Sequence, residues 1–335
     1  MRIVILDDVR IGRADISRLE ERGEVVVYEG NPATTAEVIA RAKGAEVLIS
    51  GWTEITQEVL AALPGLQLVS LWATGVDKVD VDAASRLGVA VCNVPSYATT
   101  AVAELTFGLM LAVMRKIPSA DKTMRATGVA NWRSFLGSEL CGKTLGLVGT
   151  GLIGGRVARF GYAFGMGLVG YDAREDAGLI ADTALRYAPL SELFLASDVI
   201  SLHLPLTSDT RHIVDATALR TIRRTAIIIN TARSGLIDQD ALYEALASGE
   251  IAGAGLDVVD SSRESGRALL ALDNVVVTPH IGFFTAEALD KLTSGCVNNV
   301  LHFLDGEPVN VVTEGPAGAG AAHETTMSSG PGDEP

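Results

Sequence analysis

The sequence predicts an α/β protein of two doubly wound, Rossmann-like domains, with the cofactor domain inserted into the other one. Short apolar runs rich in Val, Ile and Leu alternate with helical patterns, which is typical of parallel sheets with crossover helices. The length of 335 residues favours two domains. A glycine-rich turn begins a second α/β series near residue 145, after a first series that lacks such a turn.

The first α/β series covers residues 1–98. Its apolar runs predict strands, and because these runs do not alternate with polar residues, they indicate a parallel sheet covered on both faces. Helical patterns at 36–42 and 81–87 lie between the strands. We expect residues 285–312 to complete this domain. The predicted strands are 3–6, 25–28, 47–49, 68–71 and 89–91.

The second series forms a predicted domain at 99–284. A helix is expected from Ala98 to Met114, with Thr99 or Thr100 as its cap, and a polar, irregular stretch follows it. A last helix at 285–304 is long enough to return to the first domain, and residues 313–335 have the composition of a disordered tail. The predicted strands are 145–148, 168–171, 199–202, 226–230, 253–258 and 275–278.

The stretch from Leu145 to Asp172 has the order strand, glycine turn, helix, strand, acid. Gly149, Gly151 and Gly154 have the G-x-G-x-x-G spacing that holds a dinucleotide pyrophosphate at a helix N-terminus. Asp172 can accept hydrogen bonds from ribose hydroxyls and would repel a 2′-phosphate, which favours NAD over NADP, although Arg174 could soften that repulsion. The alternative is a glycine-rich turn in a plain βαβ unit. The predicted turn also includes Leu152 and Ile153.

Composition excludes several classes of function. The formal net charge of −14 disfavours nucleic acid and anionic membranes as partners. Three scattered cysteines predict neither a disulfide framework nor a metal site, and they favour the cytoplasm. The N-terminus is expected to be a strand rather than a signal peptide, and the apolar region at 105–114 is far shorter than the ~20 residues of a membrane span.

Polar residues at the ends of later strands indicate chemistry. Arg233 follows the strand that ends at Asn230, where it can grip a carboxylate with two hydrogen bonds or make a surface salt bridge. His280 follows Thr278 and Pro279 at the end of the last strand, and a histidine there can transfer a proton near neutral pH. His203 is expected in a structural or cofactor-wall role. Asp257 could bind the nicotinamide carboxamide or cap a turn.

Seven separated motifs together resemble the D-isomer-specific 2-hydroxyacid dehydrogenases, the group of D-lactate, D-glycerate, 3-phosphoglycerate and formate dehydrogenases. The resemblance extends from about residue 40 to 312, and the joint order of the motifs is highly specific. It implies NAD as cofactor, a small anionic substrate and a two-fold dimer formed through the region 99–143. The motifs are residues 73–77, 93–95, 149–154, 203–207, 230–235, 255–258 and 278–282.

The resemblance also implies residue roles. Arg233 would bind the substrate carboxylate and polarise its carbonyl group, and His280 would protonate the carbonyl oxygen as hydride arrives. The backbone of Thr74, Gly75 and Val76 would receive the carboxylate in the substrate domain. Further residues are implied to line the cofactor: Pro205 and Thr210 beside the adenosine half, and Thr231, Ala232, Asp257 and Gly282 beside the nicotinamide half, together with Arg233 and His280.

One departure concerns the acid that pairs with the catalytic histidine. In the family a glutamate five residues after the aspartate of the Leu-Asp-Val motif raises the pKa of the imidazole. Here that position is Ser262, and the loop is one residue shorter before His280. We expect Glu264 to take the role after a loop shift. The alternative is an unpaired histidine, which would make 2-oxo acid reduction weak near neutral pH.

Three functions follow from these patterns. The first is an NAD-dependent dehydrogenase that acts on a small 2-hydroxy or 2-oxo acid such as glyoxylate, hydroxypyruvate or D-lactate. The second keeps the hydride chemistry but uses a phosphonate or related phosphorus acid, held by Arg263 or Arg267. The third is a non-catalytic NAD-sensing regulator, which the displaced glutamate and the tail favour but Arg233 and His280 oppose.

Overall fold

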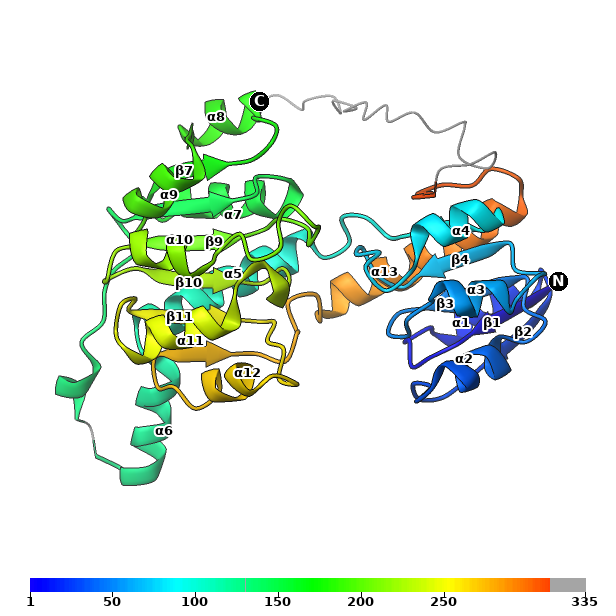
Figure 1. Cartoon of the computed structure of the whole chain (residues 1–335), viewed down its shortest axis with the longest axis horizontal. Helices are drawn as coiled ribbons and strands as arrows, with labels where there is room; N and C mark the ends of the chain where they lie inside the picture. The colour runs from blue at the N-terminus through cyan, green and yellow to red at the C-terminus, as the bar shows by residue number, and fades with distance from the viewer. Residues whose placement is uncertain (130, 314–335) are drawn as a thin grey trace, which may run out of the picture. The chain divides into compact units, whose positions relative to one another are not determined.

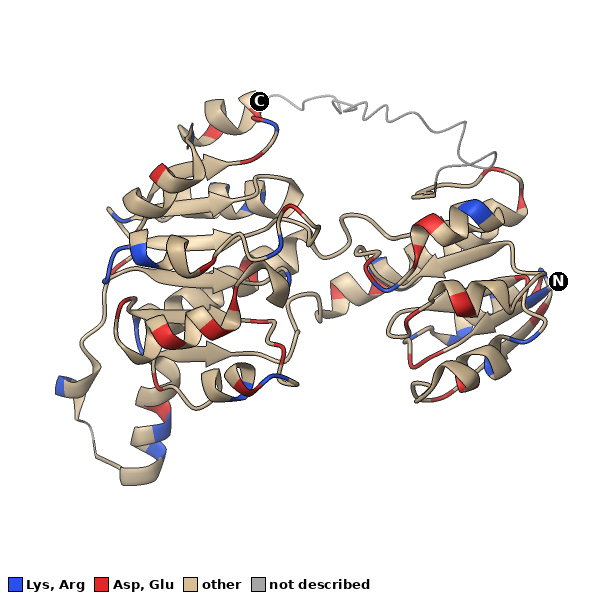
Figure 2. Cartoon of the chain, in the orientation of Figure 1, with Lys and Arg blue, Asp and Glu red and all other residues tan. Residues whose placement is uncertain are grey.

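A computed structural model describes residues 1–129 and 131–313, and it divides the chain into two compact units (Figure 1). Unit 1 contains Met1–Tyr97 and the segment from Leu289 onward, and unit 2 is Ala98–Ala288. The boundaries between the units therefore lie after Tyr97 and after Ala288. The sequence predicted them after residues 98 and 284. Both units carry acidic and basic side chains (Figure 2).

Unit 1 is built on a five-stranded parallel sheet in the order β2-β1-β3-β4-β5. One core cluster joins its strands to α2, α3 and α4, with Leu48 and Val69 fully buried in the sheet. The strands are β1 (Arg2–Ile5), β2 (Glu24–Val27), β3 (Val47–Ser50), β4 (Leu68–Leu71) and β5 (Ala90–Cys92). The helices are α1 (Arg13–Glu20), α2 (Thr35–Ala42), α3 (Gln57–Ala61), α4 (Val81–Leu87) and most of α13 (Ala286–Leu304).

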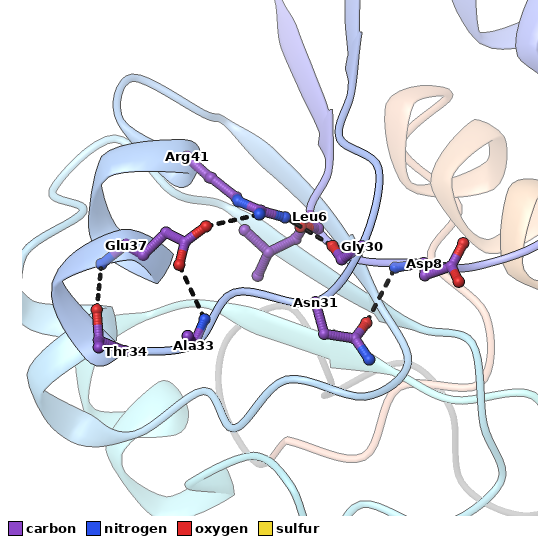
Figure 3. Close-up of polar contacts among 8 residues, drawn as sticks. All are labelled: Leu6, Asp8, Gly30, Asn31, Ala33, Thr34, Glu37 and Arg41. Atoms are coloured by element: carbon purple, nitrogen blue, oxygen red, sulfur yellow. Dashed lines mark hydrogen bonds and ion pairs between the residues drawn. The ribbon is translucent and has the colours of Figure 1, made fainter.

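A polar clamp holds the loop after β2 against the end of β1 (Figure 3). Arg41 donates from Nη1 to the carbonyl oxygens of Gly30 at 2.7 Å and Leu6 at 3.2 Å. Its Nη2 donates to Glu37 Oε1 at 2.6 Å, and Thr34 caps α2 by accepting from the Glu37 N–H. Since these donors and acceptors satisfy one another, the clamp stabilises the fold and leaves no group aimed at a ligand.

Unit 2 is built on a seven-stranded parallel sheet in the order β12-β11-β10-β9-β6-β7-β8. The chain runs outward from β6 through β7 to β8, then returns to the other side of β6 with β9. This reversal makes the carboxyl ends of β6 and β9 a topological switch point, where ligands bind in such sheets. The strands are β6 (Thr144–Val148), β7 (Gly167–Tyr171), β8 (Arg186–Tyr187), β9 (Val199–Leu202), β10 (Ile227–Asn230), β11 (Gly253–Leu256) and β12 (Val275–Val277).

Two core clusters use alternate residues of the strands in unit 2. On β10, Ile228 belongs to the cluster with α9 to α12, whereas Ile227 and Ile229 belong to the cluster with α5, α7 and α8. This period of two is the reason why the strands read as unbroken apolar runs. The helices are α5 (Thr99–Met114), α6 (Ile117–Thr127), α7 (Leu152–Ala163), α8 (Ala177–Thr183), α9 (Leu190–Ala196), α10 (Ala216–Thr221), α11 (Gln239–Ala247) and α12 (Glu264–Leu269), with short 3₁₀ turns η1 (Trp132–Phe135) and η2 (Ser234–Leu236).

Three local predictions were wrong. Ala98 is the N-cap of α5 and Thr99 lies inside the helix, because tertiary packing rather than a side-chain cap fixes this end. The helix α6 occupies part of the stretch predicted to be irregular. Its apolar residues Ile117, Ala120 and Met124 have helical spacing, but none of its residues is buried. Its boundaries still had local signals, with Pro118 in the first turn and Gly128 at φ +64° after the last. The two-residue strand β8 was not predicted.

The end of the described chain is packed. Thr313 is buried, and its Oγ1 accepts a hydrogen bond from the Val91 N–H at 3.2 Å. The rest of the segment predicted to be a disordered tail, residues 314–335, lies outside the described residues. Within residues 1–129 and 131–313, no helix combines the length and apolar character needed to cross a bilayer.

Candidate active site

The glycine turn after β6 requires glycine at two positions. Gly149 has φ +99°, and a Cβ there would lie 2.8 Å from the carbonyl carbon of His203. A Cβ on Gly154 would lie 2.0 Å from the Gly149 carbonyl oxygen. Both glycines therefore let the start of α7 pack against the ends of β6 and β9, at the switch point of the sheet.

The N-terminus of α7 forms an open cradle of backbone donors. Gly151 is the N-cap, and a Cβ on it would meet nothing within 4 Å. Among the described residues, the N–H groups of Gly151, Leu152 and Ile153 have no hydrogen-bond acceptor. Free N–H groups at the positive end of a twelve-residue helix fit the pyrophosphate of a dinucleotide.

Asp172 lies at the end of β7, beside this cradle. Its Oδ2 accepts from the Thr150 N–H at 2.7 Å, and its Oδ1 accepts from the Arg174 N–H at 3.2 Å. These bonds hold the carboxylate at the position where the ribose of a dinucleotide lies in this type of fold. The residues present therefore fit NAD.

The loop after β9 begins beside the glycine turn, where a Cβ on Gly149 would lie 2.8 Å from the His203 carbonyl carbon. Thr210 closes it by donating from Oγ1 to the Pro205 carbonyl oxygen at 2.6 Å. His203 precedes this loop, and its Nε2 bonds Ser201 Oγ at 2.8 Å. Burial lowers the pKa of His203 to about 3, so its imidazole is neutral at physiological pH. This matches the structural or wall role expected from the sequence.

The turn after β10 is held by a residue that the sequence did not single out. Asn230 is 1% exposed; its Oδ1 accepts from the Ala232 N–H at 3.0 Å and its Nδ2 donates to the Arg233 carbonyl oxygen at 2.9 Å. The Arg233 side chain is half-buried and donates from Nη1 to the Ala232 carbonyl oxygen. Thr231 is buried, with its hydroxyl 3.0 Å from that of Thr106 on α5.

Asp257, at the end of β11, holds the loop that carries His280. The carboxylate is 1% exposed and accepts from Thr278 Oγ1 at 2.6 Å, the Ile281 N–H at 2.9 Å and the Gly282 N–H at 2.8 Å. A Cβ on Gly282 would lie 2.9 Å from Asp257 Oδ2, so this loop needs glycine there. Of the two roles left open for Asp257, the geometry shows the turn cap directly.

The loop bonded by Asp257 gives His280 an unusual backbone. His280 has φ +56°, a region that costs free energy for a residue with a Cβ. Its N–H donates to the Asp257 carbonyl oxygen at 2.9 Å, and its exposed ring lies edge-on to Phe283 with centroids 5.9 Å apart. The imidazole is thus held on a fixed backbone while its ring remains accessible.

The short loop after Asp257 is closed on itself. Ser262 Oγ donates to Asp260 Oδ1 at 2.5 Å, and this bond lowers the pKa of the Asp260 carboxyl. Arg267 donates from Nη1 to the carbonyl oxygens of Ser261 and Ser262. Glu264 is exposed as the first residue of α12, and it has no side-chain hydrogen bond or ion pair within the described residues. Its pairing with the catalytic histidine stays a prediction.

In unit 1, the loop after β4 carries the predicted carboxylate site. Thr74 donates from Oγ1 to the Val94 carbonyl oxygen at 2.7 Å, and Asn93 donates from Nδ2 to the Thr74 carbonyl oxygen at 2.7 Å. The N–H groups of Gly75 and Val76 have no acceptor among the described residues. Braced in this way, the loop presents two backbone donors that suit an anion.

The parallel sheet of unit 2 brings the other predicted residues to one edge. The glycine turn, Arg233, Asp257 and His280 follow β6, β10, β11 and β12, all at their carboxyl ends. Sequence reasoning missed Asn230, although it stands at the end of a buried strand directly before the turn. No group of three or more His, Cys, Asp or Glu residues suited to a metal occurs in the described part of the chain.

Known proteins match both the sequence and the fold. Residues 107–282 match the family model of the D-isomer specific 2-hydroxyacid dehydrogenase, NAD binding domain. The chain is 42% identical over 245 residues to a hydroxypyruvate reductase of Thermotoga maritima, with 72% of this chain and 79% of that protein covered. It is 36% identical over 309 residues to a glyoxylate reductase of Korarchaeum cryptofilum, with 89% and 92% covered.

Among solved structures, an acyclic imino acid reductase in complex with NADPH and D-Arg superimposes with a TM-score of 0.86 at 34% identity. The match covers 93% of this chain and all of that one (100%). The family model covers more than half of the chain, and the glyoxylate reductase is similar over nearly its whole length. This chain therefore belongs to the D-isomer-specific 2-hydroxyacid dehydrogenase family of NAD-dependent oxidoreductases.

Proposed function

We propose that this dehydrogenase interconverts small 2-oxo and 2-hydroxy acids of the glyoxylate and hydroxypyruvate type. The observation that carries the proposal is the edge of the unit 2 sheet, where a buried asparagine holds the Arg233 turn and a buried aspartate holds the His280 loop. Fixed cationic and proton-transferring groups beside a dinucleotide cradle are what reduction of an anionic carbonyl compound requires.

Each residue has a distinct task in this proposal. The cofactor, when bound, supplies or accepts the hydride. Arg233 binds the substrate carboxylate with two parallel hydrogen bonds and polarises the carbonyl group. His280 donates a proton to the carbonyl oxygen during reduction and takes it back during oxidation. In unit 1, the N–H groups of Gly75 and Val76 have no acceptor among the described residues and suit an anionic group.

The experiment is a substrate panel with NADH and NADPH. Glyoxylate, hydroxypyruvate and pyruvate are each tested with the wild-type enzyme, with His280→Gln and with Arg233→Lys. We expect His280→Gln to lower kcat by about 10²–10⁴-fold, the usual contribution of general acid–base catalysis. Arg233→Lys should chiefly raise KM, because lysine loses the bidentate geometry. Equal rates for the wild type and His280→Gln would refute the proposal.

The other two functions receive no support from the structure. Arg263 donates to Asp240 Oδ2 on α11, and Arg267 donates to two carbonyl oxygens of its own loop, so both guanidinium groups have partners in unit 2. The relatives named above are reductases rather than regulators. The panel tests both alternatives: a 2-oxo acid bearing a phosphonate covers the first, and nucleotide binding without any turnover would indicate the second. One of the similar structures is an imino acid reductase. A mixture of a 2-oxo acid and an amine, which condense to an imine, therefore tests reduction of that imine.

We further propose a homodimer formed through the region 99–143, whose second part, residues 115–143, we call the arm. Within the arm, Trp132 is 76% exposed and Leu136 is 84% exposed. The arm has six Lys or Arg against two Asp or Glu, in a chain whose net charge is −14. Figure 2 marks Lys and Arg positions in blue on and after α6. A basic, apolar arm is complementary to the acidic surface of a second copy.

A reducing compartment such as the cytoplasm suits the cysteines. All three are free; Cys141 is exposed, while Cys92 and Cys296 are buried. Burial raises the pKa of both buried thiols to about 12, which suppresses the reactive thiolate. These thiols therefore behave as core residues.

A further inference from the structure

We propose that Tyr187 and Thr150 are positioning residues for Asp172, and that through it they set the preference for NADH over NADPH. The inference rests on the proposed use of Asp172 for the ribose hydroxyls. Tyr187 lies on the edge strand β8, 37 residues after Thr150 in the chain, yet their hydroxyl oxygens are 2.7 Å apart. Neither residue was singled out by the sequence.

The direction of each hydrogen bond in this group follows from its chemistry. The Asp176 N–H can only donate, so the Tyr187 oxygen accepts it at 3.1 Å. Ionised Asp172 can only accept, so Thr150 Oγ1 donates to its Oδ2 at 3.3 Å. The Tyr187 hydroxyl proton therefore points to Thr150 Oγ1. All donors in the group are directed toward the carboxylate.

This arrangement fixes how Asp172 meets a ligand. Its Oδ2 receives two donors from Thr150, the N–H at 2.7 Å and the hydroxyl. Its Oδ1 receives only the Arg174 N–H, which leaves one lone pair for a ribose hydroxyl. Held in one orientation by these bonds, the carboxylate accepts from a 2′-hydroxyl and repels a 2′-phosphate.

The neighbouring strand is shaped to admit the tyrosine ring. Gly170 on β7 pairs with Tyr187 on β8, and a Cβ on Gly170 would lie 2.9 Å from Leu185 Cδ2 and 3.2 Å from both Tyr187 Cε1 and Thr150 Cγ2. The absence of a side chain at Gly170 lets the ring cross to Thr150. The same hydroxyl accepts from the N–H of Asp176, the N-cap of α8, at the end of the loop after β7. Tyr187 also supports the start of this loop, Asp172, through Thr150.

The test measures NADH and NADPH dissociation constants by fluorescence titration, together with kcat and KM for the best substrate. Tyr187→Phe and Thr150→Val each remove one hydroxyl, and Thr150→Ser keeps it. We expect each of the first two to raise the Kd for NADH about fivefold, the usual effect of one hydrogen bond, with little change in NADPH affinity and in kcat at saturation. Thr150→Ser should keep the wild-type ratio of the NADH and NADPH dissociation constants. Tyr162→Phe is the control, since Tyr162 is an exposed tyrosine on α7.

The outcomes separate this inference from the proposed function. If the wild type binds neither nucleotide, the proposed cofactor use fails. If the wild type prefers NADH and both variants keep the same NADH to NADPH ratio, the positioning role is wrong while the function stands. Equal weakening of both nucleotides would show a purely structural role and would also overturn the inference. If Tyr187→Phe does not fold, the comparison of Thr150→Val with Thr150→Ser decides.

Discussion

Single buried polar residues hold the reactive turns of this enzyme. Asn230 bonds both sides of the Arg233 turn with one amide, and Asp257 bonds three groups of the His280 loop with one carboxylate. A buried polar side chain with all its partners satisfied fixes a backbone more firmly than an exposed one, because its loss leaves unpaired groups in the interior. These two residues thus fix the backbone of the two turns that carry Arg233 and His280.

The substitution Asn230→Ala tests this at the Arg233 turn. It removes one donor and one acceptor, so the turn should loosen and the guanidinium group should be misplaced. We expect kcat/KM for the 2-oxo acid to fall about tenfold, which corresponds to ~1.4 kcal/mol, chiefly through a higher KM. Steady-state kinetics and an NADH titration check this. A parallel tenfold loss of NADH affinity would contradict it, because the damage would then extend to the whole unit.

His203 should make stability depend on pH. Its folded pKa of about 3 lies below the ordinary value of 6.5. As the pH falls below 6.5, the unfolded chain binds a proton that the folded chain excludes, so this contribution to stability is lost between pH 6.5 and about 3. The slope should not exceed about 1.4 kcal/mol per pH unit.

Urea unfolding of the wild type and His203→Gln at pH 7.0, 5.5 and 4.5 measures this effect. The variant keeps an amide that can bond Ser201 but has no titrating group. We expect the difference in unfolding free energy between wild type and variant to shift in favour of the variant as the pH falls. A difference that stays constant over this range would disprove the assignment.

At the scale of elements, dinucleotide binding should depend on the close packing of α7 against the glycine turn. A Cβ on Gly154 would lie 2.0 Å from the Gly149 carbonyl oxygen, so Gly154→Ala must displace the helix from the glycine turn. We expect a loss of 1–3 kcal/mol of stability, on the order found for overpacked sites, and more than tenfold weaker NADH binding. Gly155→Ala is the matched control, because its Cβ meets its nearest neighbour at 3.4 Å. Equal behaviour of the two variants would refute the argument.

The elements differ in how well the sequence predicted them. Buried strands such as β9 (Val199–Leu202) and β10 (Ile227–Asn230) were predicted within a residue, because both faces are covered and the whole strand is apolar. The helix α6 was not predicted, because its few apolar residues are spaced along a mostly polar segment that buries no side chain. Strand β8 is only two residues long and pairs with β7 alone, too short for any pattern.

At the scale of the whole molecule, the arm is the feature that a monomer does not explain. If Trp132 and Leu136 dock on a second copy, the double variant Trp132→Asp/Leu136→Asp should shift a dimer to a monomer by light scattering. Each added carboxylate would be placed in an apolar interface against an acidic surface. Leu195→Asp is the control, since Leu195 is 62% exposed on α9, outside the arm. A monomeric wild type, or a dimer that survives the double change, would refute the proposal.

The sequence by itself determined the two α/β series, the glycine turn and the strand-end residues Arg233 and His280, because these depend on local period and on residues adjacent in the chain. Only the tertiary structure identified how they are held. Thr150 meets Tyr187 across 37 residues, and Asp257 meets Gly282 across 25. A hydrogen bond between distant residues depends on the register of strands and the packing of loops, which no local pattern encodes. The residues at the strand ends could therefore be predicted, whereas the residues that hold their turns could not.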